Sequence, residues 1–590
     1  MTAATTMQRM RLLTCSMLIS VSAINAARAQ ESATAPAATA PSESAMVNLV
    51  RLLVEQGVLK KAAGDALMAQ AEAEAMQARA VAASPAMQTA QTALPDVAPG
   101  TIRVPYIPQT VRNQIRDEIR TEVLAQAKAE GWASADQAAP EWTKRISLFG
   151  DVRFRSQSEL YSKTNSLLIF DFARINAWGP TNLGGGVLPY LNSRVDRVNR
   201  LRLRGRLGVR AAISSGVSAV FAVATGDDNG PISTNASLGG GLSKRDIWLD
   251  QAYFTLAPSK LFKSTFGRFP NPFESTDLLF DDDLRFDGVA AEFNAGSLID
   301  DRLTLAVRGG AFPLDFGSSN FPDTNNLKQK SPVKYLYSGQ VTAGARIFND
   351  VAVSVSAAYH SFQSVQGRFS TPCALYLGVT ECSTDPYRVM SPRKGNTLFG
   401  IRNILVDPAN PNAGGAQLLG LTFDYDILDI NGSVRVPIND DVRVELSGNY
   451  LRNLAFKRSD VCRFGEAGAP QNNGGAGGTT LCAATNAQPF VGGPTGYQIK
   501  GMLGYDAITK RGQWSAFAGY RYLESDAVLD SLTDSDFHLG GTNAKGYFLG
   551  GKYGIFDNVT IGSRWMSANQ IAGEERFAID VFQVDLEAKF

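Results

Sequence analysis

The sequence predicts an all-β transmembrane barrel of about eighteen antiparallel strands, with sixteen as the alternative, preceded by an N-terminal α-helical segment. From Arg145 to the C-terminus, apolar and polar residues alternate with a period of two, which is typical of strands. Short polar turns alternate with long Gly-rich connections. No run of about 20 consecutive apolar residues, which a membrane-spanning helix requires, occurs in the chain.

The composition excludes several classes of protein. The 590 residues include 57 Lys and Arg and 56 Asp and Glu, which leaves a formal charge of +1. Nucleic-acid binders carry a large positive excess, so we expect no nucleic-acid partner. Only 2 His are present, and neither lies beside a nucleophile motif such as G-x-S-x-G. We therefore expect no enzymatic activity and no cofactor.

The N-terminus has the features of a secretory signal peptide over residues 1–29. Arg9 and Arg11 precede a short apolar stretch, Leu12–Ile24, and Ala27-Arg28-Ala29 forms an A-x-A cleavage site. We expect the chain to be exported.

Two segments of different character follow. Residues 30–45 are rich in Ala, Pro, Ser and Thr and are expected to form a flexible spacer. Residues 46–135 are expected to form a helical segment in the periplasm, because apolar residues recur at helical spacings. The clearest apolar stripe consists of Val111, Ile115, Ile119 and Val123. Such a stripe needs a partner, so the helix either self-associates as a coiled coil or packs under the main domain.

Four cysteines remain after the signal peptide is removed: Cys373, Cys382, Cys462 and Cys482. An even number in an oxidising compartment indicates disulfides, with three pairings open. Local pairs, Cys373 with Cys382 and Cys462 with Cys482, are the simplest. A four-cysteine metal site is the alternative, but the C-x-x-C spacing that it favours is absent, so we expect no metal.

The barrel is expected over residues 145–590. The predicted strands begin near Arg145, Val198, Val217, Asp246, Leu261, Arg285, Leu303, Lys334, Val351, Thr397, Gln417, Ile430, Val442, Gly496, Gln513, Gly546, Val559 and Phe577. In hydrocarbon every backbone hydrogen bond must be made within the protein, so these strands must close on themselves. An even number of strands places both barrel termini at the rim with short turns, which is the periplasmic rim.

Five arginines share one face of the strand that begins near Val198: Arg200, Arg202, Arg204, Arg206 and Arg210. Near the membrane midplane each arginine on the lipid face would cost about 2 to 4 kcal/mol, so the arginines must face the interior. There they either pair with acids on neighbouring strands and brace the wall, or stay free to line a pore and attract anions.

An acidic run, Asp281, Asp282 and Asp283, lies on the connection between Pro270 and Leu284. If this connection folds inward, its carboxylates and the arginine ladder would set a transverse field across a constriction. The alternative is a solvated outer loop.

Six stretches carry a resemblance to a known family. They are Gly267-Arg268-Phe269-Pro270-Asn271-Pro272-Phe273, Ser275-Thr276-Asp277-Leu278, Asp281-Asp282-Asp283-Leu284, Val104-Pro105-Tyr106-Ile107-Pro108, Arg116-Asp117-Glu118 and Phe149-Gly150-Asp151-Val152-Arg153. These motifs resemble the putative porins of Gram-negative outer membranes, and the chain is more distantly similar to the phosphate-selective porins. The resemblance implies a passive channel in outer-membrane lipid, commonly a homotrimer. It also implies that the outer-membrane assembly machinery recognises the C-terminal Phe590.

We therefore expect an outer-membrane porin that passes small hydrophilic solutes or ions, with an anion bias from the arginine ladder. The alternative function is a plugged barrel that mainly anchors the outer membrane to the cell wall or to a partner.

Overall fold

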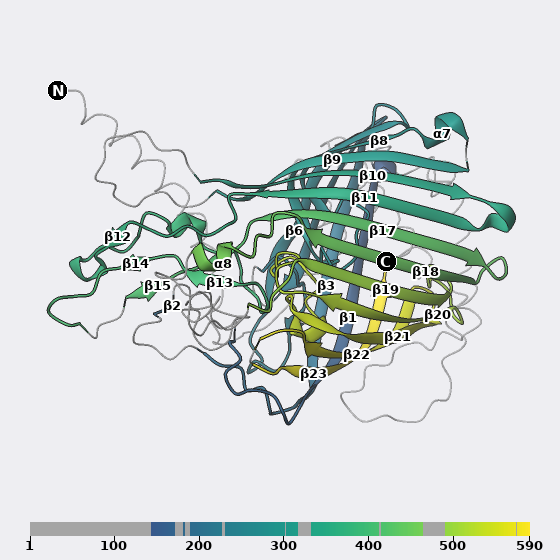
Figure 1. Cartoon of the computed structure of the whole chain (residues 1–590). Coiled ribbons are helices and arrows are strands. Elements are labelled where there is room, and N and C mark those ends of the chain that lie inside the picture. The colour runs from purple at the N-terminus through teal and green to yellow at the C-terminus, as the bar shows by residue number, and fades with distance from the viewer. Residues whose placement is uncertain are drawn as a thin grey trace, which may run out of the picture. The chain divides into compact units, whose positions relative to one another are not determined.

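Sixteen long antiparallel strands close into a barrel (Figure 1). The computed structural model describes residues 143–171, 181–182, 189–226, 230–300, 302–316, 332–411, 415–463, 490–573 and 575–590. The predicted signal peptide (1–29), spacer (30–45) and helical segment (46–135) lie outside the described residues. No helix in the described part of the chain is both long and apolar enough to cross a membrane.

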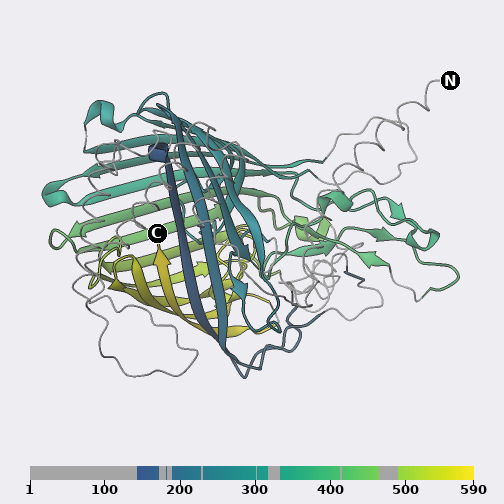
Figure 2. The ribbon, with the colours of Figure 1, turned by 180° about the vertical axis from the view of Figure 1, so that it is seen from behind.

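The ring consists of β1 (Ile146–Tyr161), β3 (Arg197–Ser214), β4 (Val217–Gly226), β6 (Asp246–Leu256), β7 (Phe262–Pro270), β8 (Arg285–Asn294), β9 (Leu303–Asp315), β10 (Lys334–Arg346), β11 (Ala352–Gln363), β17 (Tyr425–Pro437), β18 (Arg443–Asn453), β19 (Thr495–Gly504), β20 (Trp514–Leu523), β21 (Ala544–Phe556), β22 (Val559–Gln570) and β23 (Ala578–Lys589). Each strand pairs antiparallel with the next, and β23 pairs with β1 to close the ring. In Figure 2 the dark blue β1 and β3 run beside the yellow C-terminal strand, where the barrel closes. The very short β5 (Ala236–Ser237) adds to β3 beyond the end of β4.

The remaining elements are short and lie in the connections. They are η2 (Thr143–Arg145), β2 (Thr181–Asn182), α7 (Gly296–Ile299), η3 (Phe348–Asp350), β12 (Pro372–Cys373), η4 (Leu375–Leu377), η5 (Asp385–Tyr387), β13 (Leu398–Gly400), β14 (Asn403–Ile404), β15 (Ala416–Gln417), β16 (Leu419–Leu421), α8 (Asp460–Arg463) and η7 (Phe537–Leu539).

Alternation along the strands separates an outward apolar face from an inward polar one. On β3, Leu201 and Leu207 are exposed, whereas Arg204 between them is buried. On β23, Phe582 and Leu586 are exposed, whereas Gln583 is buried. Since successive side chains of a strand point to opposite faces, the exposed apolar face is the one available to lipid.

The prediction of eighteen ring strands is wrong, because the strands expected near Thr397 and Gln417 do not belong to the ring. β13 pairs with β16, and β15 pairs with β2, within the long connections. Their apolar residues are buried instead of forming a lipid-facing surface: Phe399 belongs to a small local core, whereas Leu398 and Leu421 belong to the main core inside the protein. Sixteen strands, the alternative count, is correct.

Short and long connections lie at opposite ends of the barrel. α7 and η3 mark the end with short turns, whereas β12 and β14 lie in the 364–424 connection at the other end (Figures 1 and 2). Both termini of the ring lie at the end with short turns, where Gly150 and Phe590 exchange backbone hydrogen bonds of 3.0 and 3.1 Å.

One of the two candidate disulfide pairs is formed in the structure. Cys373 and Cys382 are bonded, with their Cα atoms 5.8 Å apart, and they close a turn in the 364–424 connection. The other candidate pair includes Cys482, which lies outside the described residues.

Candidate functional site

Residues 271–284, which connect β7 to β8, cross the interior of the barrel and are called loop A. The Thr276 hydroxyl donates to Asn449 Oδ1 of β18 at 2.7 Å. The Glu274 amide donates to Gln340 Oε1 of β10 at 2.9 Å. Farther along the loop, Asp283 reaches β3. These strands lie far apart around the ring, and only a loop inside the barrel can contact them all.

A second connection, residues 524–543 between β20 and β21, lies against loop A and is called loop B. The Asp281 amide donates to the Leu532 carbonyl at 2.8 Å, and the Asp534 amide donates to the Asp277 carbonyl at 3.0 Å. The Ser535 amide also donates to Asp281 Oδ2 at 2.9 Å. The two loops therefore form one hydrogen-bonded unit within the barrel.

Apolar side chains fix loop A to one side of the wall. The core that they form includes Phe273, Leu278, Leu279, Phe280 and Leu284 of loop A, Phe286 of β8, Phe312 of β9, Leu336 of β10, Phe362 of β11 and residues 527–529 and 532 of loop B. Burying this much apolar surface is the main reason for a loop to remain inside a barrel instead of in solvent. On the other side of the wall, arginines of β20, β22, β1 and β3 pair with carboxylates of loops A and B.

The arginine ladder divides into paired and unpaired members. Arg200 pairs with Glu159 at 2.9 Å. Arg204 pairs with Asp151 of β1 and with Glu587 of β23, each at 2.7 Å. Arg206 pairs with Asp283 of loop A. Among the described residues, neither Arg202 nor Arg210 has an ion pair, although the Arg210 guanidinium carbon lies 5.7 Å from the centre of the Phe149 ring.

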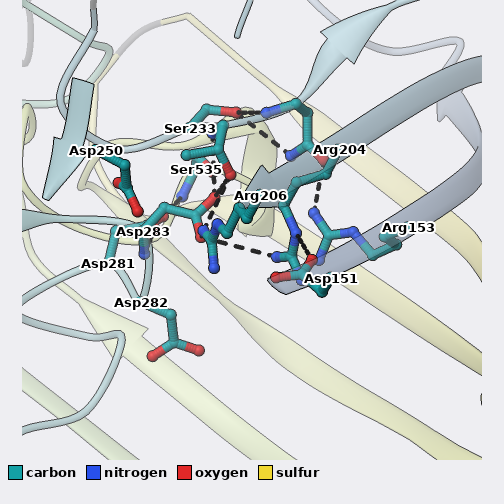
Figure 3. Close-up of polar contacts among 12 residues, drawn as sticks. Asp151, Arg153, Arg204, Arg206, Ser233, Asp250, Asp281, Asp282, Asp283 and Ser535 are labelled. Carbon is teal, nitrogen blue, oxygen red and sulfur yellow. Dashed lines mark hydrogen bonds and ion pairs between the residues drawn. The ribbon is translucent and has the colours of Figure 1, made fainter. Parts of the chain in front are cut away.

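The three acidic residues of loop A occupy different environments (Figure 3). Asp283 accepts hydrogen bonds from Arg206 and from the Thr234 hydroxyl, the latter at 2.8 Å. Asp281 is buried, and its two carboxylate oxygens accept hydrogen bonds from the backbone amides of Asp283 and Ser535. Asp282 is exposed, and in Figure 3 its carboxylate points away from the other labelled groups. The run thus places one carboxylate on the cationic wall, one between the loops and one in an exposed position away from both.

The pKa values of the loop carboxyls follow from these environments. Burial, with the nearby charges of Asp534 and Asp283, raises the pKa of Asp281 well above its ordinary value. Burial alone would also raise the pKa of Asp283, but the charges of Arg206 and Arg204 outweigh it and lower this pKa. The two neighbouring carboxyls therefore have pKa values shifted in opposite directions.

Loop A has a second anchor at Asp277, for which the sequence predicted no role. Asp277 lies 2.6 Å from Arg521 of β20, and Arg521 also contacts Asp534 of loop B at 3.0 Å. Arg564 of β22 lies 3.6 to 3.7 Å from the same two carboxylates. Burial would raise the pKa of Asp277, yet the two arginines lower it to about 2.

Two arginines of β1, Arg153 and Arg155, were also not predicted to be site residues. Arg155 makes two hydrogen bonds to Asp585 of β23, at 2.7 and 2.9 Å, and one to Asp536 of loop B at 2.7 Å. Arg153 donates to the Asn235 side-chain carbonyl at 2.6 Å. The signal that could have found them is present in β1, where Asp151, Arg153 and Arg155 occupy alternate positions.

No group of three or more His, Cys, Asp or Glu side chains in the described residues is arranged to hold a metal ion.

Among solved structures, the chain is similar to OprB of Pseudomonas putida at high pH, with a TM-score of 0.40 and 9% identity over 76% of this chain and 95% of that chain. It is similar to the outer-membrane channel DcaP of Acinetobacter baumannii, with a TM-score of 0.35 and 9% identity over 75% of this chain and 97% of that chain. The Salmonella typhi OmpF complex with daunomycin gives a TM-score of 0.34 and 9% identity over 75% and 97%. No curated protein sequence matches the chain.

The family model described as "Putative porin" matches residues 43–590, which is most of the chain. The chain therefore belongs to the putative porin family of outer-membrane channels.

Proposed function

We propose that the protein is a passive diffusion channel for small hydrophilic solutes, with an anion preference set by unpaired arginines on its inner wall. The observation that carries this proposal is the uneven pairing of the ladder. Carboxylates neutralise Arg200, Arg204 and Arg206, whereas Arg202 and Arg210 have no ion pair among the described residues. Excess positive charge inside a channel attracts anions and repels cations.

The position of loop A supports a path along the polar side of the interior. Its apolar residues pack toward β8–β11, while its exposed Asp282 points away from the pairs that hold Asp283. Solutes would pass between Asp282 and the wall formed by β1 and β3. The acid on one side and the arginines on the other would give the path a transverse field.

Reversal potential in a salt gradient across a planar bilayer tests the anion preference. The wild-type protein is expected to reverse at a potential of the sign set by chloride, and Arg202→Gln with Arg210→Gln is expected to move it toward zero. Arg435→Gln is the matched control, because Arg435 is also a strand arginine but pairs with Glu445 on the β17–β18 side of the ring. An unchanged potential in the double variant would remove these arginines from the selectivity of the channel.

A second candidate function is a plugged barrel that acts as an anchor. The observation that favours it is the apolar core that loops A and B build inside the barrel. The two functions differ in conductance, since a plugged barrel would give no stepwise currents in the same bilayers.

For the assembled protein we propose export through the signal peptide at residues 1–29, homotrimerisation, residues 46–135 in the periplasm and recognition of Phe590 during assembly. The support for these points is the sequence pattern and the family resemblance. Chemical crosslinking of outer membranes, with and without residues 46–135, would test whether this segment contributes to the trimer.

A further inference from the structure

Four arginines form a compact patch on the inner wall, which we call the arginine cluster: Arg153 and Arg155 of β1, and Arg202 and Arg204 of β3. Arg153 lies directly opposite Arg204 in the strand register, and Arg155 lies directly opposite Arg202. Like charges that face each other across a strand pair destabilise a sheet unless counter-charges offset them. The distribution of carboxylates around the cluster therefore shows which charges the protein itself neutralises.

The carboxylates all bind one diagonal of the cluster. Arg155 is held by Asp585 and Asp536. Arg204 is held by Asp151 and Glu587. Arg155 and Arg204 are only 6% and 8% exposed, which agrees with the rule that a charge is buried when it is paired.

The other diagonal, Arg153 and Arg202, has no such neutralisation. Arg153 donates to a neutral amide, the side chain of Asn235, and neither arginine has an ion pair among the described residues. The Nε atoms of both are buried without a hydrogen-bond acceptor. Arg206 and Arg564 share this feature of Nε, but each has a carboxylate near its terminal nitrogens.

Both unpaired arginines are half-buried, unlike the paired ones. Part of each of these two side chains is therefore open, whereas Arg155 and Arg204 are almost wholly covered. Diagonal neighbours in an antiparallel pair have Cα atoms about 7 to 8 Å apart, which two long arginine side chains can bridge with one small ligand. Planar guanidinium groups bind carboxylate and phosphate oxygens in a bidentate manner.

The acid directly opposite Arg153 on β23 does not pair with it. Glu587 lies opposite Arg153 in the β1–β23 register, but its Oε1 accepts from Arg204 at 2.7 Å. Its Oε2 lies 3.8 Å from the ammonium groups of both Lys552 and Lys589. The charge of Glu587 is thus shared among three other cations.

We propose that Arg153 and Arg202 form a binding subsite for a small dianion with anionic oxygens at both ends or on one centre, namely a short dicarboxylate or hydrogen phosphate. Two guanidinium groups without an ion pair among the described residues can each bind one anionic group of a dianion, whereas a monoanion would satisfy only one of them. The subsite rests on the proposed function and extends it, because it specifies the class of solute that would bind transiently in the channel beside β1 and β3.

Dianion block of the chloride current tests the subsite. Single-channel currents of the full-length protein are recorded at constant ionic strength while succinate, phosphate or acetate is added. Succinate or phosphate is expected to reduce the chloride current at about tenfold lower concentration than the monoanion acetate. Arg153→Gln and Arg202→Gln are each expected to raise the half-blocking concentration of the dianion about tenfold, the loss of one charge-assisted contact. The relative potency of succinate and phosphate identifies the preferred source of the two charges.

Arg435→Gln is the matched control and should leave block by the dianions unchanged. Gel electrophoresis of heated and unheated samples checks that each variant is folded, because a folded barrel migrates more slowly after heating has unfolded it. Equal block by succinate, phosphate and acetate, or block that survives both substitutions in folded protein, would overturn the subsite.

Calorimetric titration of the detergent-solubilised protein with succinate and phosphate separates this proposal from the proposed function. Loss of channel steps with retained dianion binding at Arg153 and Arg202 would reject the channel and keep the subsite. Channel steps without dianion binding would reject the subsite and keep the channel.

Discussion

The guanidinium of Arg204 on β3 donates to Oε1 of Glu587 on β23 at 2.7 Å, across the intervening strand β1. The same guanidinium donates through Nε to Asp151 of β1, also at 2.7 Å. One side chain thus joins three strands at the place where the two ends of the ring meet. The 383 residues between Arg204 and Glu587 make this pair a contact that forms only when the barrel closes.

Arg204→Ala is expected to destabilise the barrel by about 3 kcal/mol, because it leaves two acidic side chains of the wall without their main cation. Urea unfolding in detergent, followed by tryptophan fluorescence, measures the change. Arg435→Ala is the control, since the exposed Arg435 pairs with one carboxylate, Glu445, at 2.9 Å and such exposed pairs contribute about 0 to 1 kcal/mol. Equal effects of the two substitutions would contradict a structural role for Arg204 at the closure.

Asp283→Asn is expected to increase the preference for anions, because it removes the carboxylate that neutralises Arg206. The reversal potential in a potassium chloride gradient should then move further toward the chloride limit. Asp287→Asn, which removes an exposed carboxylate from β8, should leave the potential where it is. A shift toward cations after Asp283→Asn would show that Arg206 does not face the ion path.

The contact between loop B and the 364–424 connection is expected to weaken as pH rises from about 4 to about 7. Asp530 is buried, its amide donates to Asn396 Oδ1 at 2.8 Å, and burial raises its pKa to about 7. The ordinary pKa of an aspartate is about 4. Between about pH 4 and pH 7, Asp530 is therefore protonated while the contact is closed and loses this proton when the contact opens. The free energy of opening therefore falls through this window and levels off above it.

Hydrogen exchange of the amides near Asn396 and Asp530, corrected for the intrinsic rate at each pH, measures this opening. In Asp530→Asn the slope contributed by this carboxyl should disappear. The slopes from Asp526, whose pKa burial raises to about 6, and from Lys394, whose pKa burial lowers to about 7, should remain. Identical pH profiles for wild type and Asp530→Asn would contradict the assignment.

Alternation with a period of two was sufficient to predict the barrel, because lipid on one side and solvent on the other impose it on every strand of the ring. It could not distinguish ring strands from the short pairs near Thr397 and Gln417. Those segments are also extended and apolar, and only their pairing with each other, such as Leu398 with Leu421, and their burial show that they lie outside the ring.

The site was predicted less completely for a related reason. The pattern on β3 fixed the face of the arginines, but not which of them find acids, since partners such as Glu587 and Asp283 come from distant parts of the chain. Loop B was not predicted to lie inside the barrel. In the sequence, Asp534 and Asp536 look like ordinary acidic residues of a solvent-exposed loop. Only their contacts with Arg521 and Arg155 show that they lie inside the barrel.

Modification of a cysteine at position 282 during current recording tests the central claim most directly. In Asp282→Cys, a membrane-impermeant thiosulfonate reagent is expected to lower the single-channel current in a stepwise manner, because the side chain at this position is exposed and would lie beside the proposed ion path. The wild-type protein, which keeps its own cysteines, should show no change. A current that stays constant while mass spectrometry shows position 282 fully modified would contradict a path between loop A and the arginine-bearing wall.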